Sequence, residues 1–330
     1  MQGIGVICFA ASYAAALLFD VLRFFFHPRL CRVMAVGWLT AGFAAHSIYI
    51  FYKALLPVER FLGNEQIFFL VAAWGLVPVC LYFTFQRKQV PFVTFFVPLI
   101  LVLICFGMEG SLLGKMPEVA EVAHGETTLL WRVLHVVSLL LAFLSLAVAA
   151  IAGIMYIRQD RLLKDRVTPS DSAQLPSLEW SGNIARDAII LSQYFLLFGI
   201  LTGIIAGFSL VTSGQPNPLT IYDPLVFGGL ILCVLISVVI SKTIWRGLHA
   251  RERAGLAVML FIILLFFLWN ALLSPNSHWK KTITPTASLQ MNQSDGTCHS
   301  SSPNAVTSRS VSPNVIGLLF ADTEHSEVSR

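Results

Sequence analysis

Eight apolar segments dominate the sequence, and each is long enough to cross a lipid bilayer as a helix. They lie near residues 3–22, 33–56, 66–85, 90–107, 129–157, 188–211, 224–244 and 255–273. A hydrocarbon core of about 30 Å requires about 20 apolar residues at a helical rise of about 1.5 Å per residue. None of the segments shows the two-residue alternation of a membrane β-strand. The sequence therefore predicts an all-α, polytopic integral membrane protein with about eight transmembrane helices.

The composition argues against several other classes of protein. Charged residues make up 12% of the chain, against about 25% in a soluble domain, and mean hydropathy is +0.75. A soluble enzyme, a DNA-binding protein and a secreted disulfide scaffold are therefore disfavoured. The six cysteines show no C-x-x-C spacing, so they predict neither a redox pair nor a zinc site. The net charge of +4 does not indicate a nucleic-acid partner, because the basic residues serve the membrane topology.

The positions of the basic residues predict the orientation of the chain. Of the 22 Lys and Arg residues, 14 lie in or beside the first, third, fifth and seventh connections. They are Arg23, Arg29, Arg32, Arg87, Lys88, Arg158, Arg161, Lys164, Arg166, Arg186, Lys242, Arg246, Arg251 and Arg253. Cytoplasmic connections carry an excess of Lys and Arg, so these four are expected inside and both termini outside. The expected location is a cytoplasmic (inner) membrane of bacterial type, with the lipid bilayer as a partner.

The order of the segments predicts three parts of the chain. Residues 1–128 form a first block of four spans, and residues 129–279 form a second block of four. The second block contains a cytoplasmic link at 158–187, in which RQDRLLKDR extends the fifth helix and TPSDSAQLPS is a flexible segment. Residues 280–330 are rich in Ser, Thr and Asn with few aromatics, so this tail is expected to be disordered.

Ionisable side chains within the apolar segments are candidates for function, because burying them in hydrocarbon is costly. Asp20 and Arg23 are three residues apart near the end of their segment, and we expect an interfacial ion pair. His46 lies near the centre of the second segment. It is either a neutral imidazole hydrogen-bonded to a neighbouring helix or a ligand or proton carrier, and the sequence leaves both interpretations open.

Two further histidines are expected on the outer side of the membrane. His135 follows Trp131 by one turn near the outer end of the fifth segment, and His278 follows the end of the eighth. The predicted topology brings both imidazoles to the same face at a similar depth. Neutral imidazole is a common axial ligand of haem iron, so the pair is a candidate metal site. The alternative is that His278 is an ordinary interfacial residue beside Trp279.

Asp223 and Pro224 open the seventh segment. An acidic residue before a proline in the first turn is a common helix start, and local physics favours this interpretation.

Four stretches in the second half of the sequence, taken in their order along the chain, carry a resemblance to a known family. The first, at 129–164, carries Trp131 and His135; the second, at 175–207, ends near a Thr-Gly pair at Thr202 and Gly203. The third, at 222–240, opens with Asp223 and Pro224, and the fourth is LLSPNSHWKK with His278. Together they resemble the cytochrome c assembly protein family, the membrane haem-handling proteins of the CcsA and CcmC type with their HemX-like relatives.

The resemblance implies that the protein binds haem (haem b) at the outer face. His135 and His278 match the two outer iron ligands of the family, and His46 matches an early histidine that contacts haem in some members. The haem propionates are expected to approach basic residues such as Arg132. The implied role is a haem chaperone or assembly factor, at most one part of a haem-ligating complex, with a cytochrome c assembly partner or a haem-biosynthesis protein.

One departure from the family pattern leaves a second hypothesis open. Haem-handling members carry a tryptophan-rich outer loop before the Asp-Pro pair, but residues 207–224 contain no tryptophan. This difference points toward the HemX-like branch. The alternative function is therefore a membrane regulator or scaffold of haem biosynthesis that does not ligate haem. A transporter is disfavoured, because the chain shows no internal repeat.

Overall fold

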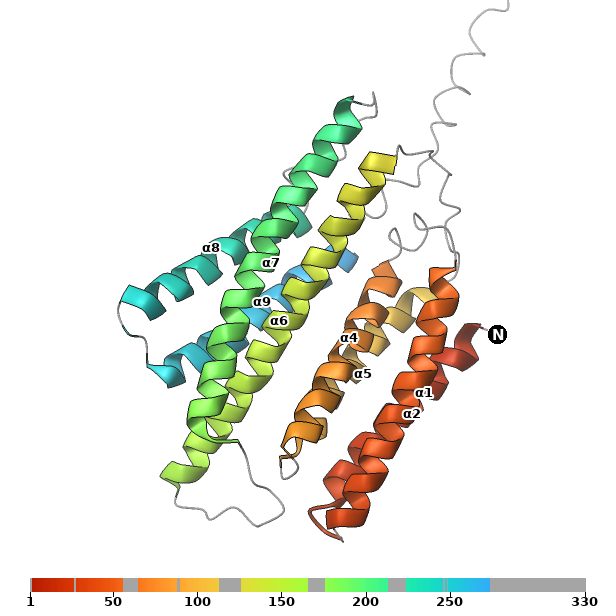
Figure 1. Cartoon of the computed structure of the whole chain (residues 1–330), viewed down its shortest axis with the longest axis vertical. Coiled ribbons are helices and arrows are strands. Elements are labelled where there is room, and N and C mark those ends of the chain that lie inside the picture. Colours follow the sequence, from red (N-terminus) through yellow and green to blue (C-terminus); the bar gives the residue numbers. More distant parts are fainter. Residues whose placement is uncertain are drawn as a thin grey trace, which may run out of the picture. The chain divides into compact units, whose positions relative to one another are not determined.

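A computed structural model describes residues 2–26, 28–55, 65–87, 90–112, 126–165, 176–212, 224–245, 247 and 249–273. Within these residues the chain forms eight helices and no strands (Figure 1). The helices are α1 (Gln2–Leu22), α2 (Pro28–Ala54), α4 (Glu65–Gln86), α5 (Phe92–Leu112), α6 (Glu126–Lys164), α7 (Leu178–Thr212), α8 (Pro224–Trp245) and α9 (Ala250–Leu273). The predicted all-α class is confirmed.

The lengths of the helices agree with a polytopic membrane protein. Seven of the described helices are long and apolar enough to cross a membrane, and α5 has a shorter apolar stretch, Phe92–Met108. The longest helix is α6, whose 39 residues extend over about 58 Å, roughly twice the hydrocarbon thickness. Its last turns form the predicted extension, with Lys164 Nζ 2.8 Å from Asp160 Oδ2. The protein is therefore an integral membrane protein with helices that continue beyond the bilayer.

In the first half of the chain, four helices form a set in which each helix packs against two of the others. Helix α1 packs on α2, α2 on α4, α4 on α5, and α5 back on α1. Large apolar side chains fill the space between them, and the fully buried ones include Phe9, Tyr13, Leu39, Leu76 and Phe96. The interior of this set is thus a packed core.

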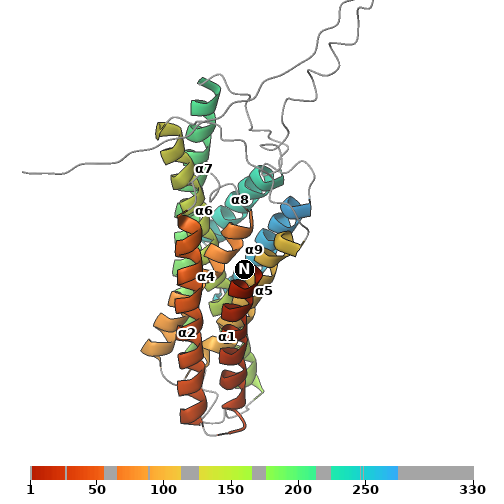
Figure 2. The same ribbon diagram turned by 90° about the vertical axis from the view of Figure 1, so that its right-hand side faces the viewer.

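The other four helices form a second set of the same kind, in which each helix contacts two neighbours. The long helices α6 and α7 lie side by side in both views (Figures 1 and 2), α7 contacts α8, α8 contacts α9, and α9 returns to α6. Helix α4 also contacts α6, which joins the two sets. All eight described helices belong to one compact unit, and the predicted division of the chain at residue 128 stays a prediction. The predicted tail at 280–330 lies outside the described residues.

The predicted ion pair between Asp20 and Arg23 is present, and it is buried. Asp20 Oδ1 lies 3.2 Å from Arg23 Nη1, and the two residues are 2% and 6% exposed. The other oxygen, Oδ2, accepts hydrogen bonds from the backbone N–H and the hydroxyl of Thr94, at 2.9 and 2.7 Å. Thr94 lies in the first turn of α5, where backbone N–H groups lack helical acceptors. Asp20 therefore ties α1 to the start of α5.

Helix α7 begins at Leu178, earlier than the predicted span at 188. Ser177 caps this start, because its Oγ accepts a hydrogen bond from the backbone N–H of Trp180 at 3.3 Å. The Trp180 ring packs edge-on against Phe83, with centroids 5.5 Å apart, and the Arg87 guanidinium lies 4.9 Å above it. Part of the predicted cytoplasmic link is therefore a helix anchored on α4.

Candidate functional site

Three of the predicted site residues lie within two turns near the start of α6. Trp131, Arg132 and His135 are all half-buried. Trp131 and His135 are four residues apart, a spacing that places them on the same side of a helix. The sequence folds in this way because most residues from 129 onward are apolar and there is no glycine or proline before Gly153.

The His135 ring is held by a backbone group of α7. His135 Nδ1 lies 2.7 Å from the carbonyl oxygen of Gly199. A carbonyl oxygen can only accept a hydrogen bond, so Nδ1 carries the hydrogen and donates it. In the neutral imidazole the lone pair then resides on Nε2. Metal-ligating histidines have this arrangement in most proteins, with the second ring nitrogen bonded to a carbonyl or carboxylate.

Small residues on α7 allow this contact. A Cβ atom at Gly203 would lie 2.8 Å from both Cε1 and Nδ1 of His135, so no larger residue fits beside the ring. A Cβ atom at Gly199 would lie 2.8 Å from a methyl carbon of Leu139. Between the two glycines, the Thr202 hydroxyl donates to the backbone of its own helix, to Phe198 O at 2.9 Å and Gly199 O at 3.0 Å. Gly203 thus leaves the space that the His135 imidazole occupies, whereas Gly199 makes room for Leu139.

His46 lies in a different environment, between α1 and α2. Its ring is fully buried and stacks on Phe9, with centroids 4.1 Å apart and an interplanar angle of 6°. Its Nδ1 lies 3.3 Å from the Tyr13 hydroxyl, while its Nε2 is buried and has no hydrogen-bond partner among the described residues. The interpretation of a neutral histidine bonded to a neighbouring helix therefore fits this geometry.

The structure does not bring all the predicted residues together. His135 belongs to the α6–α9 set and His46 to the α1–α5 set. His278 and Asp223 lie outside the described residues, although α8 does begin at Pro224, as predicted. Within the described residues, no group of three or more His, Cys, Asp or Glu side chains could hold a metal ion.

Gly203 was noted in the sequence as part of a Thr-Gly pair, but the sequence did not predict that α7 holds the His135 ring. The Gly199 carbonyl accepts a hydrogen bond from the His135 ring, and Gly203 leaves the space beside that ring. Their spacing of four residues within an apolar segment was a visible signal for close helix packing. The carbonyl acceptor itself left no signal, because every residue carries one.

The comparison with protein families gave one match. Residues 64–275 match a family described as "Cytochrome C assembly protein". The match covers more than half of the chain, includes α4 and α5, and leaves out α1 and α2. No curated protein and no solved structure gave a significant match.

Proposed function

Because the chain belongs to the cytochrome c assembly protein family, with a role in cytochrome c biogenesis, we propose that it binds haem and holds it for delivery to an assembly partner. The family match covers α4–α9, the part of the molecule that contains the His135 site. Haem is the cargo in this proposal. The proposed site lies at the outer face of a cytoplasmic membrane.

The observation that carries the proposal is the hydrogen bond from His135 Nδ1 to Gly199 O. It favours the tautomer whose Nε2 lone pair can bind iron, and it limits rotation of the ring. The donor chemistry at His135 therefore fits a haem ligand.

The other residues have subordinate roles in this mechanism. His278 is the proposed second ligand, from the chain that follows α9. Arg132 is one turn from His135 on α6 and would attract the haem propionates through its positive charge. Trp131 offers an aromatic face next to the same site. If either imidazole withdrew, one coordination position of the iron would open, and a partner that supplies a ligand there could begin to take over the cargo.

The alternative function is a HemX-like regulator or scaffold of haem biosynthesis. The absence of tryptophan from residues 207–224 favours it, because the chain lacks the aromatic platform expected of a haem-handling loop. In this alternative the protein contacts a haem-biosynthesis protein and binds no haem.

The visible spectrum of the purified protein tests the proposal. Full-length protein is isolated in detergent from haem-replete cells, and its Soret band is compared with those of His135→Ala, His278→Ala and His46→Ala. We expect the wild type to carry the band and the first two variants to lose it, since each removes an iron ligand. His249→Ala is the matched control, because His249 is exposed in the connection before α9.

The outcomes separate the two functions. A wild-type protein without a Soret band, even after added haem, would exclude the ligand proposal and favour the regulator. Loss of the band in His46→Ala alone would move the haem site to the interior of the first four helices.

A further inference from the structure

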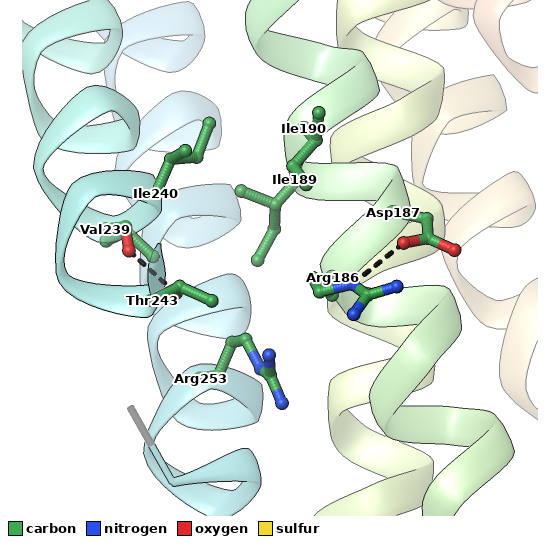
Figure 3. Close-up of a pocket in the computed structure, with 8 residues that line it drawn as sticks. All are labelled: Arg186, Asp187, Ile189, Ile190, Val239, Ile240, Thr243 and Arg253. Carbon is green, nitrogen blue, oxygen red and sulfur yellow. Dashed lines mark hydrogen bonds and ion pairs between the residues drawn. The ribbon is translucent and has the colours of Figure 1, made fainter. Parts of the chain in front are cut away.

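A cavity of about 370 Å³ opens between α7, α8 and α9, away from the His135 site. Its apolar part is formed by Ile189 and Ile190 of α7 and by Val239 and Ile240 of α8. Arg186, Asp187, Thr243 and Arg253 line the rest. In Figure 3 the isoleucines lie at one end of the cavity and the arginines at the other. The cavity is thus amphipathic, with one apolar end and one basic end.

Arg253 is the central cation of this cavity. It belongs to the first turns of α9 and reaches toward α7 (Figure 3). Its Nε atom is buried and has no hydrogen-bond partner in the described part of the chain. A buried donor of a charged group that lacks an acceptor is costly, and an anionic ligand would remove this cost.

Among the residues that the structure describes, no carboxylate forms an ion pair with Arg253. Asp187 also lines the cavity, but its Oδ1 is 3.0 Å from Arg186 Nε, and both side chains are largely exposed. Asp160 is 3.4 Å from Arg251 and 2.8 Å from Lys164, so it too is already paired. The Thr243 hydroxyl donates to Val239 O at 2.8 Å within its own helix. The donors available to an anion therefore come from the arginines.

The cavity lies at the depth where lipid headgroups are expected. The apolar stretch of α8 ends at Thr243 and that of α9 begins at Ala250. Thr243 and Arg253 thus lie at the boundary between the hydrocarbon and the polar region, while the isoleucines lie toward the hydrocarbon. By the distribution of Lys and Arg, this is the predicted cytoplasmic side, where anionic lipids are recognised by basic pockets between helices.

We propose that this cavity binds one anionic phospholipid, with its phosphate at Arg253 and Arg186 and its acyl chain along Ile189, Ile190 and Ile240. A soluble anion would use only the basic end, and a zwitterionic lipid would bring a second cation close to the arginines. The volume suits a headgroup with the first part of its chains. The proposal is independent of haem binding.

Lipid titration followed by native mass spectrometry tests it. Full-length protein in a non-ionic detergent is titrated with phosphatidylglycerol and, separately, with phosphatidylcholine. We expect tighter binding of phosphatidylglycerol and about a tenfold weakening in Arg253→Gln, which removes a charge-assisted hydrogen bond. Arg251→Gln is the matched control, because it makes the same change on the same helix at a residue that does not line the cavity.

Several results would overturn the proposal. Equal loss in Arg251→Gln and Arg253→Gln would show a general effect of net charge. Displacement of phosphatidylglycerol by millimolar inorganic phosphate would assign the site to a soluble anion. Equal binding of phosphatidylcholine would show that the headgroup charge is not recognised.

A second variant keeps the test decisive if Arg253→Gln does not fold. Ile240→Trp fills the apolar end and leaves both arginines in place. We expect it to weaken phosphatidylglycerol binding as well, because the acyl chain loses its space. Wild-type affinity in this variant would contradict the proposed position of the chain.

Discussion

At the scale of single residues, the tautomer of His135 depends on its neighbour on α7. The Gly199 carbonyl accepts from Nδ1, and Gly203 leaves just enough room for the ring. The sequence predicted His135 because a histidine near the end of an apolar segment is rare and costly. It did not predict the partner, since a backbone carbonyl is no property of residue type. A candidate ligand could therefore be found from sequence, whereas its orientation required the packing of two helices.

Gly203→Ala is expected to weaken haem binding while leaving both histidines in place. The added Cβ would lie 2.8 Å from the ring, so the ring must shift away from the Gly199 carbonyl. Loss of such an orienting contact typically lowers metal affinity by about 10- to 100-fold. Haem titration followed at the Soret band measures the change.

Gly229→Ala is the matched control for this variant. Gly229 lies on α8, and a Cβ atom there would meet nothing within 4 Å. Equal haem affinity for Gly203→Ala and the wild type would mean that the contact with α7 does not orient the ligand.

At the scale of elements, the eight helices were predictable because long apolar segments are separated by charges, and Pro224 marks the start of α8. The start of α7 was not predicted. Its first turns carry Glu179, Arg186 and Asp187, which interrupt the apolar pattern by which spans are recognised. Ser177 was a usable signal for the helix start, but the anchoring of Trp180 on Phe83 depends on tertiary packing.

The close packing of α6 on α9 requires a glycine at position 153. A Cβ atom at Gly153 would lie 2.6 Å from the backbone oxygen of Ala254, and backbone atoms cannot give way without moving the helix. Gly153→Ala is therefore expected to lower stability by about 1–3 kcal/mol, the usual cost of overpacking. Monodisperse protein remaining after heating in detergent measures this loss.

For Gly255→Ala, on α9, we expect no loss of stability, in contrast to Gly153→Ala. A Cβ atom there meets nothing within 4 Å, and alanine is favoured over glycine in a helix interior by about 0.5–1 kcal/mol. This variant should be as stable as the wild type or more so. If both variants behaved alike, the close approach of α6 and α9 would be contradicted.

At the scale of the whole molecule, the order of spans could be predicted, whereas the neighbours of each helix could not. Segments that are apolar on all sides have no distinct face to indicate which helix they pack on. The two closed sets, α1–α2–α4–α5 and α6–α7–α8–α9, thus emerged only from tertiary contacts. The family match begins before α4 and so spans both sets, while His46, on α2, lies outside it. His135 therefore lies within the matched region of the chain, whereas His46 lies outside it.

The orientation of the molecule in the membrane can be tested at two connections that are predicted to lie on opposite sides. Ser170, between α6 and α7, lies in a basic connection that is predicted to be cytoplasmic; Ser213, between α7 and α8, is predicted to be outside. Each is changed to cysteine in the full-length protein, and intact cells are treated with a membrane-impermeant maleimide. We expect Ser213→Cys to be labelled at once and Ser170→Cys only after permeabilisation, with the unsubstituted protein giving the background of its six native cysteines. The reverse pattern would place the His135 end of α6 on the cytoplasmic side, because that end of the helix lies opposite the connection that contains Ser170. Haem delivery at the outer face would then be contradicted.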